Sequence, residues 1–307
     1  MKELVPWFEE TDYPGGEGGG ALYPDALATV ALGPLASLRA VRQAGSNWPG
    51  VLARVMARRL FSVHTTMYVR TRCGSRLQAP PRDRGWWTIV EVFGTDSYYL
   101  GHLAKDAVAT CVDIGANVGA FSVAVAERFP NARVLAFEAS PRVADHLRRN
   151  IERNRLGRSV EVRWGAVVGS GAPPEVVLWD DPQNSALNSL LPPTAAQPRV
   201  GATASSVPSI PLEDVLAEAG SEVDLLKCDV EGAEYQIFGS TDPRALAGVN
   251  RAVVEYHPLE GHSPAELAAA LDRAGLQCVR HQFVPACSGL GVMWFERRGH
   301  RTGGPVR

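Results

Sequence analysis

Short apolar runs alternate with longer helical runs from residue 107 to residue 298, and this alternation limits the possible folds more than any other feature of the sequence. It is typical of an α/β domain with a mainly parallel sheet, because each parallel strand needs a crossover helix. Two strand-like runs after the last crossover are predicted to end the sheet as a hairpin. The predicted strands are 107–113, 132–138, 160–167, 223–229 and 251–257, then 276–283 and 290–298; the clearest helices are 141–157 and 264–275, each ended by a glycine, Gly157 and Gly275.

The chain before this alternation is organised differently. We predict an N-terminal extension over residues 1–84, with a helical cap and then a hairpin around Cys73 and Gly74. The alternating domain spans 85–298, and 299–307 is predicted to be a flexible tail. The segment 172–211, rich in Pro, Ser and Ala, breaks the alternation. Such a long excursion usually lies over a site or is partly disordered.

Composition excludes several classes of partner. A formal net charge of -2 gives no basic surface for a nucleic-acid backbone. Five scattered cysteines without a CxxC pair argue against a disulfide framework and against a zinc site. The acidic start of the chain does not resemble a secretory signal, and no run of about 18 apolar residues is present for a membrane helix. We therefore expect a cytoplasmic protein without membrane or nucleic-acid partners.

A glycine-rich turn follows the first predicted strand and leads into a helix. It contains Asp113, Gly115, Asn117 and Gly119, and its glycines let the backbone turn sharply and a ligand approach. Asp113 distinguishes this turn from the pyrophosphate-binding GxGxxG turn, because a carboxylate there would repel a pyrophosphate. It would suit a cationic ligand such as S-adenosylmethionine, directly or through water. Glu138 ends the next strand, where a carboxylate can accept both hydroxyls of a ribose.

These motifs resemble the FkbM-type family of S-adenosylmethionine-dependent methyltransferases. The similarity lies in VDIGANVGAFSVAVAERFP, VLAFEASP, VDLLKCDVEGAEYQIF and AVVEYHP, and it covers about residues 85 to 297. It implies a Rossmann-like class I methyltransferase fold, with a mainly parallel seven-stranded sheet and helices on both faces. It also implies an O-methyl product on a small molecule, often a sugar or a polyketide-type natural product in a tailoring pathway. The cofactor residues assigned on this basis are Asp113, Gly115, Asn117, Gly119, Glu138, Ala139, Ala166, Asp229 and Tyr98.

Three residues are predicted to act on the acceptor. The resemblance places Asp229 and Glu231 at the reactive end of the cofactor, and His257 ends the fifth strand, where a histidine can serve as general base. Simpler explanations remain: a Lys227–Asp229 ion pair, first-turn charges on a helix, and a structural histidine. Two carboxylates without a third obvious ligand are a weak metal signal, so no metal is predicted.

Two other functions remain open at this level. A NAD-dependent oxidoreductase would share the fold, although Asp113 and the glycine spacing disfavour it. A non-catalytic cofactor-binding protein would keep the pocket without turnover. The residues do not identify the methyl acceptor, nor do they exclude nitrogen as the methylated atom. Asn184, Ser185 and Asn188 are candidates to reach the substrate, and the helical cap either closes over it or forms a homodimer contact.

Overall fold

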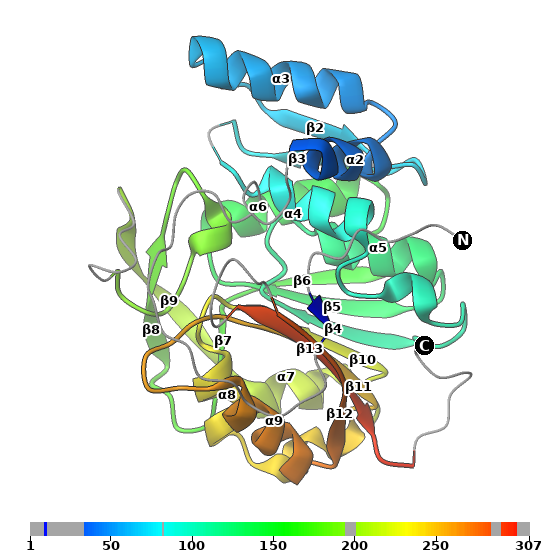
Figure 1. The fold of residues 1–307 in the computed structure, drawn as a ribbon. Coiled ribbons are helices and arrows are strands. Elements are labelled where there is room, and N and C mark those ends of the chain that lie inside the picture. The colour runs from blue at the N-terminus through cyan, green and yellow to red at the C-terminus, as the bar shows by residue number, and fades with distance from the viewer. Residues whose placement is uncertain (1–8, 11–33, 82, 194–200, 284–289, 300–307) are drawn as a thin grey trace.

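A computed structural model describes residues 9–10, 34–81, 83–193, 201–283 and 290–299. Its centre is an eight-stranded sheet in the order β1-β12-β13-β11-β10-β4-β5-β6 (Figure 1). Five of these strands run parallel to one another, as the alternation predicts: β4 (Thr110–Ile114), β5 (Arg133–Glu138), β6 (Val160–Trp164), β10 (Leu225–Cys228) and β11 (Arg251–Tyr256).

Two antiparallel strands finish the sheet. β12 (Leu276–Phe283) and β13 (Gly291–Arg297) pair with each other, and β13 also pairs with β11. The predicted seven-strand sheet is therefore confirmed. The sequence analysis did not anticipate β1 (Glu9–Glu10), a two-residue strand that pairs with β12 at the edge.

Helices cover both faces of the sheet. α5 (Ala120–Arg128) and α6 (Pro141–Arg153) lie on one face; α7 (Leu212–Ala219), α8 (Glu234–Ser240) and α9 (Pro264–Arg273) lie on the other. Successive strand residues point to opposite faces of the sheet. Cys111 therefore packs on the face of α5 and α6, and Val112 packs on the face of α7, α8 and α9. In the described part of the chain, no helix is both long and apolar enough to cross a membrane.

The end of α6 differs from the prediction. The helix stops at Arg153 rather than at Gly157, and Arg155 takes the left-handed conformation with φ 58°. The Arg155 N–H donates to the Glu152 carbonyl and the Leu156 N–H donates to the Ile151 carbonyl, as in a Schellman cap. Leu156 packs on the buried cluster that contains Ile151. This apolar contact stabilises the helix end without a glycine, so the position of Gly157 did not predict it.

The predicted single strand 160–167 is also wrong. Gly165, with φ 153°, separates β6 from β7 (Ala166–Val168), which belongs to a second sheet of order β7-β9-β8. β8 (Glu175–Asp180) and β9 (Thr203–Pro211) come from the excursion, where the sequence analysis predicted no strand. β9 contains two prolines, Pro208 and Pro211, and proline in a sequence usually argues against a central strand.

The N-terminal part packs on the same face as α5 and α6. It contains α2 (Pro34–Ala44), α3 (Trp48–Phe61) and a hairpin of β2 (Met67–Arg70) and β3 (Arg76–Ala79), followed by α4 (Trp86–Val90), η1 (Glu91–Thr95) and η2 (Leu100–His102). The predicted hairpin around Cys73 and Gly74 is thus present. Residues 22–33 of the predicted helical cap and the tail from residue 300 lie outside the described residues.

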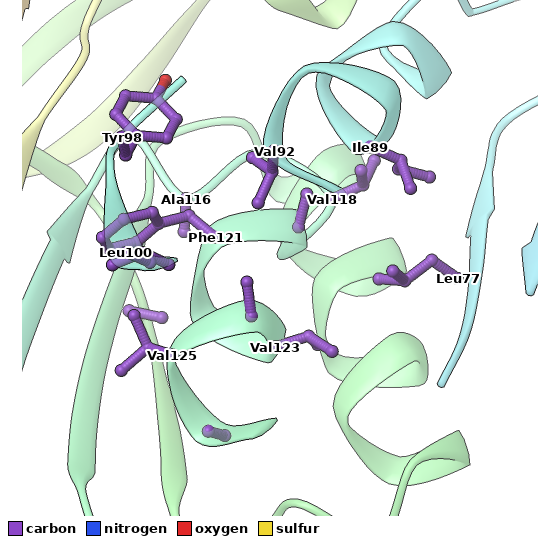
Figure 2. Close-up of a cluster of buried hydrophobic side chains, with 14 of the residues drawn as sticks. Leu77, Ile89, Val92, Tyr98, Leu100, Ala116, Val118, Phe121, Val123 and Val125 are labelled. Carbon is purple, nitrogen blue, oxygen red and sulfur yellow. The ribbon is translucent and has the colours of Figure 1, made fainter. Parts of the chain in front are cut away.

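One hydrophobic cluster joins this N-terminal part to the sheet. Figure 2 shows Leu77 of β3 and Ile89 of α4 beside Val118 and Val123 at the start of α5. Asn150 of α6 adds a polar tie, since its side chain bonds both the N–H and the carbonyl of Gln78. The first helices and the hairpin are therefore part of the core that supports the glycine turn.

Candidate active site

The glycine turn lies at the carboxyl end of β4, where sequence analysis expects a ligand. Gly115 has φ 75°, and a Cβ placed on it would lie 1.8 Å from the carbonyl oxygen of Asp229. Only glycine permits this approach of two strand ends. Asn117 and Gly119 are also left-handed, with φ 49° and 88°, and Gly119 precedes α5. The turn is therefore held by backbone conformations that its sequence selects.

Asp113 has a different place from the one predicted. Its side chain is completely buried, and it accepts a hydrogen bond of 2.6 Å from the Ser122 hydroxyl. The ammonium group of Lys227 lies 3.4 Å from Asp113 and 3.3 Å from Asp229, and it donates to the Gly115 carbonyl at 2.7 Å. A carboxylate with no exposed surface cannot contact a ligand without rearrangement. Asp113 instead stabilises the turn through its contacts with Lys227 and Ser122.

Glu138 lies beside the turn as predicted, and it has a second task. One carboxylate oxygen accepts the N–H of Asn117 at 2.9 Å, and the other accepts the N–H of Ser140 at 2.8 Å. Ser140 in turn caps α6 by accepting the N–H of Val143. Glu138 therefore connects the glycine turn to the start of the next helix. Burial raises the pKa of Glu138 to about 7, although these backbone N–H groups favour its charged form.

Tyr98 joins two carboxylates at the ends of neighbouring strands. Its hydroxyl lies 2.9 Å from the Glu255 carboxylate and 3.2 Å from that of Asp229. Burial raises the pKa of Glu255 to about 7, and the nearby Asp229 adds to the effect. Desolvation of its carboxyl group, and then the charges of Glu255, Asp229 and Glu231, raise the pKa of Glu91 well above its usual range. Sequence analysis missed Glu91, which reaches this acidic group from the irregular turn η1.

The three predicted catalytic residues come together. Nε2 of His257 lies 3.4 Å from the Glu231 carboxylate and 4.0 Å from that of Asp229. On its other side, Nδ1 lies 3.0 Å from the completely buried Glu234. The backbone of Glu231 is left-handed, with φ 54°. Sequence analysis treated Glu234 as a first-turn charge of the following helix, and the structure makes it the partner of His257.

Protonation of this group follows from its surroundings. Burial disfavours the charged imidazolium of His257, but Glu231 and Glu234 more than offset this, so the pKa of His257 lies well above its usual value. Burial likewise raises the pKa of Glu231 to about 8. His257 and Glu231 therefore keep a proton to higher pH than the same groups would in water.

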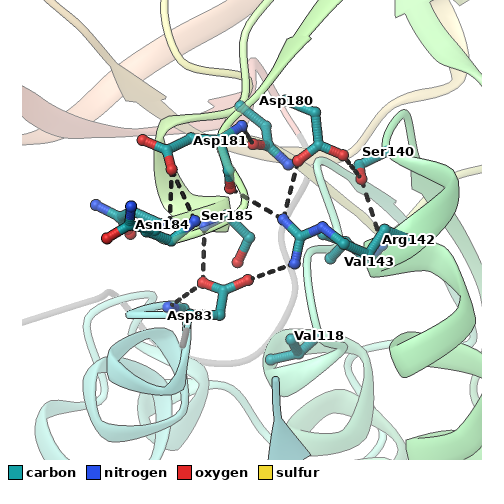
Figure 3. Close-up of polar contacts among 12 residues, drawn as sticks. Asp83, Val118, Ser140, Arg142, Val143, Asp180, Asp181, Asn184 and Ser185 are labelled. Atoms are coloured by element: carbon teal, nitrogen blue, oxygen red, sulfur yellow. Dashed lines mark hydrogen bonds and ion pairs between the residues drawn. The ribbon is translucent and has the colours of Figure 1, made fainter. Parts of the chain in front are cut away.

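The excursion lies over the glycine turn and is fastened there by a polar network (Figure 3). The Ser185 hydroxyl bonds the Asn117 side chain at 3.2 Å, and the Ser185 N–H donates to the completely buried Asp83. Arg142 of α6 bridges Asp83 and Asp180, each at 2.9 Å. Sequence analysis expected the excursion to cover a site, but it did not detect the Asp83–Arg142–Asp180 clamp, whose members are far apart in the sequence.

The remaining predicted residues are more peripheral. Ala139 is half-buried, and its carbonyl accepts the indole N–H of Trp164 at 3.0 Å. Ala166 is buried in a small cluster with Leu178 and Val207. Asn188 accepts the N–H of Asp181 at 2.8 Å and so shapes the excursion from within. The described contacts of these residues are structural.

Comparison with known proteins finds relatives among methyltransferases. A methyltransferase from Sordaria araneosa, sdnD, is 32% identical over 213 residues, which cover 62% of this chain and 81% of that protein. The 31-O-demethyl-FK506 methyltransferase FkbM of Streptomyces tacrolimicus is 27% identical over 218 residues, covering 62% and 82%. A solved O-methyltransferase of Bacillus cereus is 15% identical, with a TM-score of 0.37, over 66% of this chain and 81% of that one. The family model for the methyltransferase FkbM domain matches residues 113–278, and the chain therefore belongs to the FkbM methyltransferase family.

Proposed function

We propose that this protein is an S-adenosylmethionine-dependent O-methyltransferase that methylates a hydroxyl of a small molecule. The observation that carries the proposal is the glycine turn itself: Glu138 binds it at Asn117, and Gly115 in the same turn lies against the backbone of Asp229, which belongs to the Asp229–Glu231–His257 group. A ribose acceptor and an acidic reactive end then belong to one site at the carboxyl ends of β4, β5, β10 and β11.

The residues of the turn fit this cofactor. An ionised carboxylate offers about four lone-pair positions, and Glu138 uses two for the N–H groups of Asn117 and Ser140. Acceptor capacity therefore remains for the two hydroxyls of an adenosine ribose. Gly115 leaves the turn without a side chain at its closest approach to Asp229. When bound, S-adenosylmethionine supplies an electrophilic methyl group on a sulfonium.

The chain's own residues then hold the acceptor and handle its proton. Tyr98 fixes the carboxylates of Asp229 and Glu255, and Glu234 fixes the ring of His257. Methyl transfer needs little covalent help from a protein, so holding the reacting atoms about 3 Å apart supplies much of the rate. Removal of the acceptor proton beside Asp229, Glu231 and His257 adds about 10²-fold or more.

The acidic surroundings disfavour an anionic acceptor. Carboxyl groups of Glu91, Asp229, Glu231 and Glu255 face one region, so an anionic acceptor would meet repulsion there. The named relatives include a 31-O-demethyl-FK506 methyltransferase. We therefore propose a hydroxyl on a sugar or a polyketide-type natural product as the acceptor.

Calorimetric titration with S-adenosylhomocysteine tests the cofactor, with NAD titrated in parallel. We expect micromolar binding of the first ligand only, and a loss of at least about tenfold in Glu138→Ala, since a charge-assisted acceptor is removed. Glu152→Ala, on the exposed side of α6, is the matched control and should bind normally. Binding of NAD instead, or of neither ligand, would overturn the proposal.

The reactive end needs a separate test. His257→Ala should slow methylation of the acceptor while affinity for the cofactor stays nearly unchanged, because His257 lies with the acidic group rather than beside Glu138. A large loss of S-adenosylhomocysteine binding in that variant would contradict the role given to His257.

A further inference from the structure

Three ligand atoms from two strand ends converge at the reactive end. Asp229 follows β10, Glu231 lies two residues later, and His257 follows β11. One nitrogen and two carboxylate oxygens from these residues all lie within 4.8 Å of one another. Two atoms bound to one metal ion at about 2.1 Å each stand about 3 to 4 Å apart. The distances of 3.4 and 4.0 Å from His257 Nε2 to the two carboxylates fall in this range.

The orientation of His257 provides an independent observation. Glu234 accepts the N–H groups of Val230 and Gly232 at 2.9 Å each, so it acts as a buried hydrogen-bond acceptor. Nδ1 of His257, 3.0 Å away, is therefore the nitrogen that carries the hydrogen. A histidine held by a carboxylate in this way is the usual arrangement of a metal ligand.

The other ring nitrogen then points a lone pair at two further acceptors. The His257 side chain is only 8% exposed, and among the described residues no hydrogen-bond donor reaches Nε2. Nζ of Lys227 contacts Oδ2 of Asp229, whereas Nε2 of His257 faces Oδ1. Lys227 therefore does not lie between Asp229 and His257. Three lone-pair donors that face one another need a positive charge between them, which is either a proton on Nε2 or a metal ion.

We propose that Asp229, Glu231 and His257 bind a divalent transition-metal ion, with Mn²⁺ as the representative. One imidazole and two carboxylates form a mixed nitrogen and oxygen set that suits such an ion better than Ca²⁺. Three protein ligands leave coordination positions open for another molecule. The ion takes the position that a proton occupies in the metal-free protein.

The role of the ion rests on the proposed function. The acceptor oxygen would bind at an open position, where the ion makes its hydroxyl more acidic. The hydroxyl proton is released to water, the oxygen forms the new bond to the methyl carbon, and the carbon–sulfur bond breaks with its electron pair left on sulfur. His257 is then a ligand that positions the acceptor, and the acceptor must present an oxygen able to coordinate a metal.

Calorimetric titration of the untagged, EDTA-dialysed protein with Mn²⁺ alone tests the site. We expect one site per chain and at least about tenfold weaker binding in Glu231→Gln. That variant is suitable because the only described contact of the Glu231 carboxylate is with His257, so the fold should persist. Glu255→Gln is the matched control: it removes a carboxylate from the same acidic region outside the three converging ligands, and it should bind Mn²⁺ within about threefold of the wild type.

The outcomes separate this inference from the proposed function. No Mn²⁺ binding, or equal binding in Glu231→Gln, overturns the metal site and leaves a protonated His257 as the positive charge. The titration with S-adenosylhomocysteine is run on the same preparation. Mn²⁺ binding without S-adenosylhomocysteine binding would support the site and refute the proposed function, and the reverse would refute only the site.

Discussion

Glu138 shows how one side chain can serve both the fold and the proposed cofactor. Its carboxylate holds the N–H of Asn117 and the N–H of Ser140, yet it is buried enough that its pKa rises to about 7. Protonation turns one oxygen into a donor, and every described hydrogen-bond partner of the carboxylate is itself a donor. The charged form is therefore the one that can receive ribose hydroxyls.

This predicts a pH dependence of cofactor binding. Because the pKa of Glu138 is raised, the carboxylate is lost as the pH falls through about 7, so affinity for S-adenosylhomocysteine should fall by up to about tenfold per unit between about pH 8 and pH 6. Calorimetry across this range measures it. Glu138→Gln should bind weakly with a flatter profile, and an unchanged slope in that variant would assign the effect to another group.

A side chain at Gly115 should destabilise the protein. In Gly115→Ala, the new methyl group would lie 1.8 Å from the Asp229 carbonyl in a left-handed conformation. We expect the free energy of unfolding to fall by about 3 kcal/mol or more, through strain and overpacking together. Gly171→Ala is the control, since Gly171 has nearly the same φ, 77°, but open space around its Cβ position. It should cost about 1 kcal/mol. Equal losses in urea unfolding would contradict the close contact.

At the scale of elements, the clamp formed by Asp83, Arg142 and Asp180 decides where the excursion lies. In the described stretch 181–193 after β8, the buried side chains are polar: Asp181, Ser185 and Ser189. Polar contacts to α6 and Asp83 therefore hold this stretch over the turn (Figure 3). Loss of the clamp should release this segment while the main sheet stays intact.

Arg142→Met tests the clamp. Removing the guanidinium leaves the buried Asp83 without its ion-pair partner, so we expect a loss of about 1–3 kcal/mol and faster amide exchange at residues 183–185. Arg148→Met, on the same helix, removes only an exposed pair with Asp145 and should leave both measurements unchanged. Unchanged exchange at 183–185 in Arg142→Met would show that other contacts hold the excursion.

At the scale of the whole molecule, one buried cluster runs from the N-terminal helices to the central sheet. It includes Val41 of α2, Leu77 of β3 and Val123 of α5, so the N-terminal part has no separate core in the described structure. Elements that share a core are expected to unfold together. The N-terminal part should therefore contribute to the stability of the cofactor turn rather than form an independent cap.

Leu77→Ala tests this coupling. Leu77 is 1% exposed, so the cavity should lower the free energy of unfolding by about 2–5 kcal/mol and shift a single transition seen by both fluorescence and circular dichroism. Leu60→Ala in α3 changes the same side chain where it is 64% exposed, and it should have little effect. Two separate transitions in Leu77→Ala would mean that the N-terminal part unfolds alone.

The sequence by itself determined the elements whose signals are local. The apolar runs predict the five parallel strands and the final hairpin. The glycines after β4 predict the turn there, and in the structure they are left-handed. These preferences depend on neighbouring residues alone. Local signals failed where another contact decided the outcome. Arg155 takes the left-handed position that a glycine usually takes at the end of α6, and pairing with β8 makes a strand of the proline-containing β9.

Only the tertiary structure decided which side chains meet. Asp113 is buried because Lys227 comes from the adjacent strand β10, in register with it. His257 faces Glu231 because β10 and β11 are neighbours and parallel, so their carboxyl ends share one edge. Side-chain convergence depends on strand order and register, which residues far apart in the sequence establish together. A sequence can therefore name each member of the site without showing that a third ligand joins the two carboxylates.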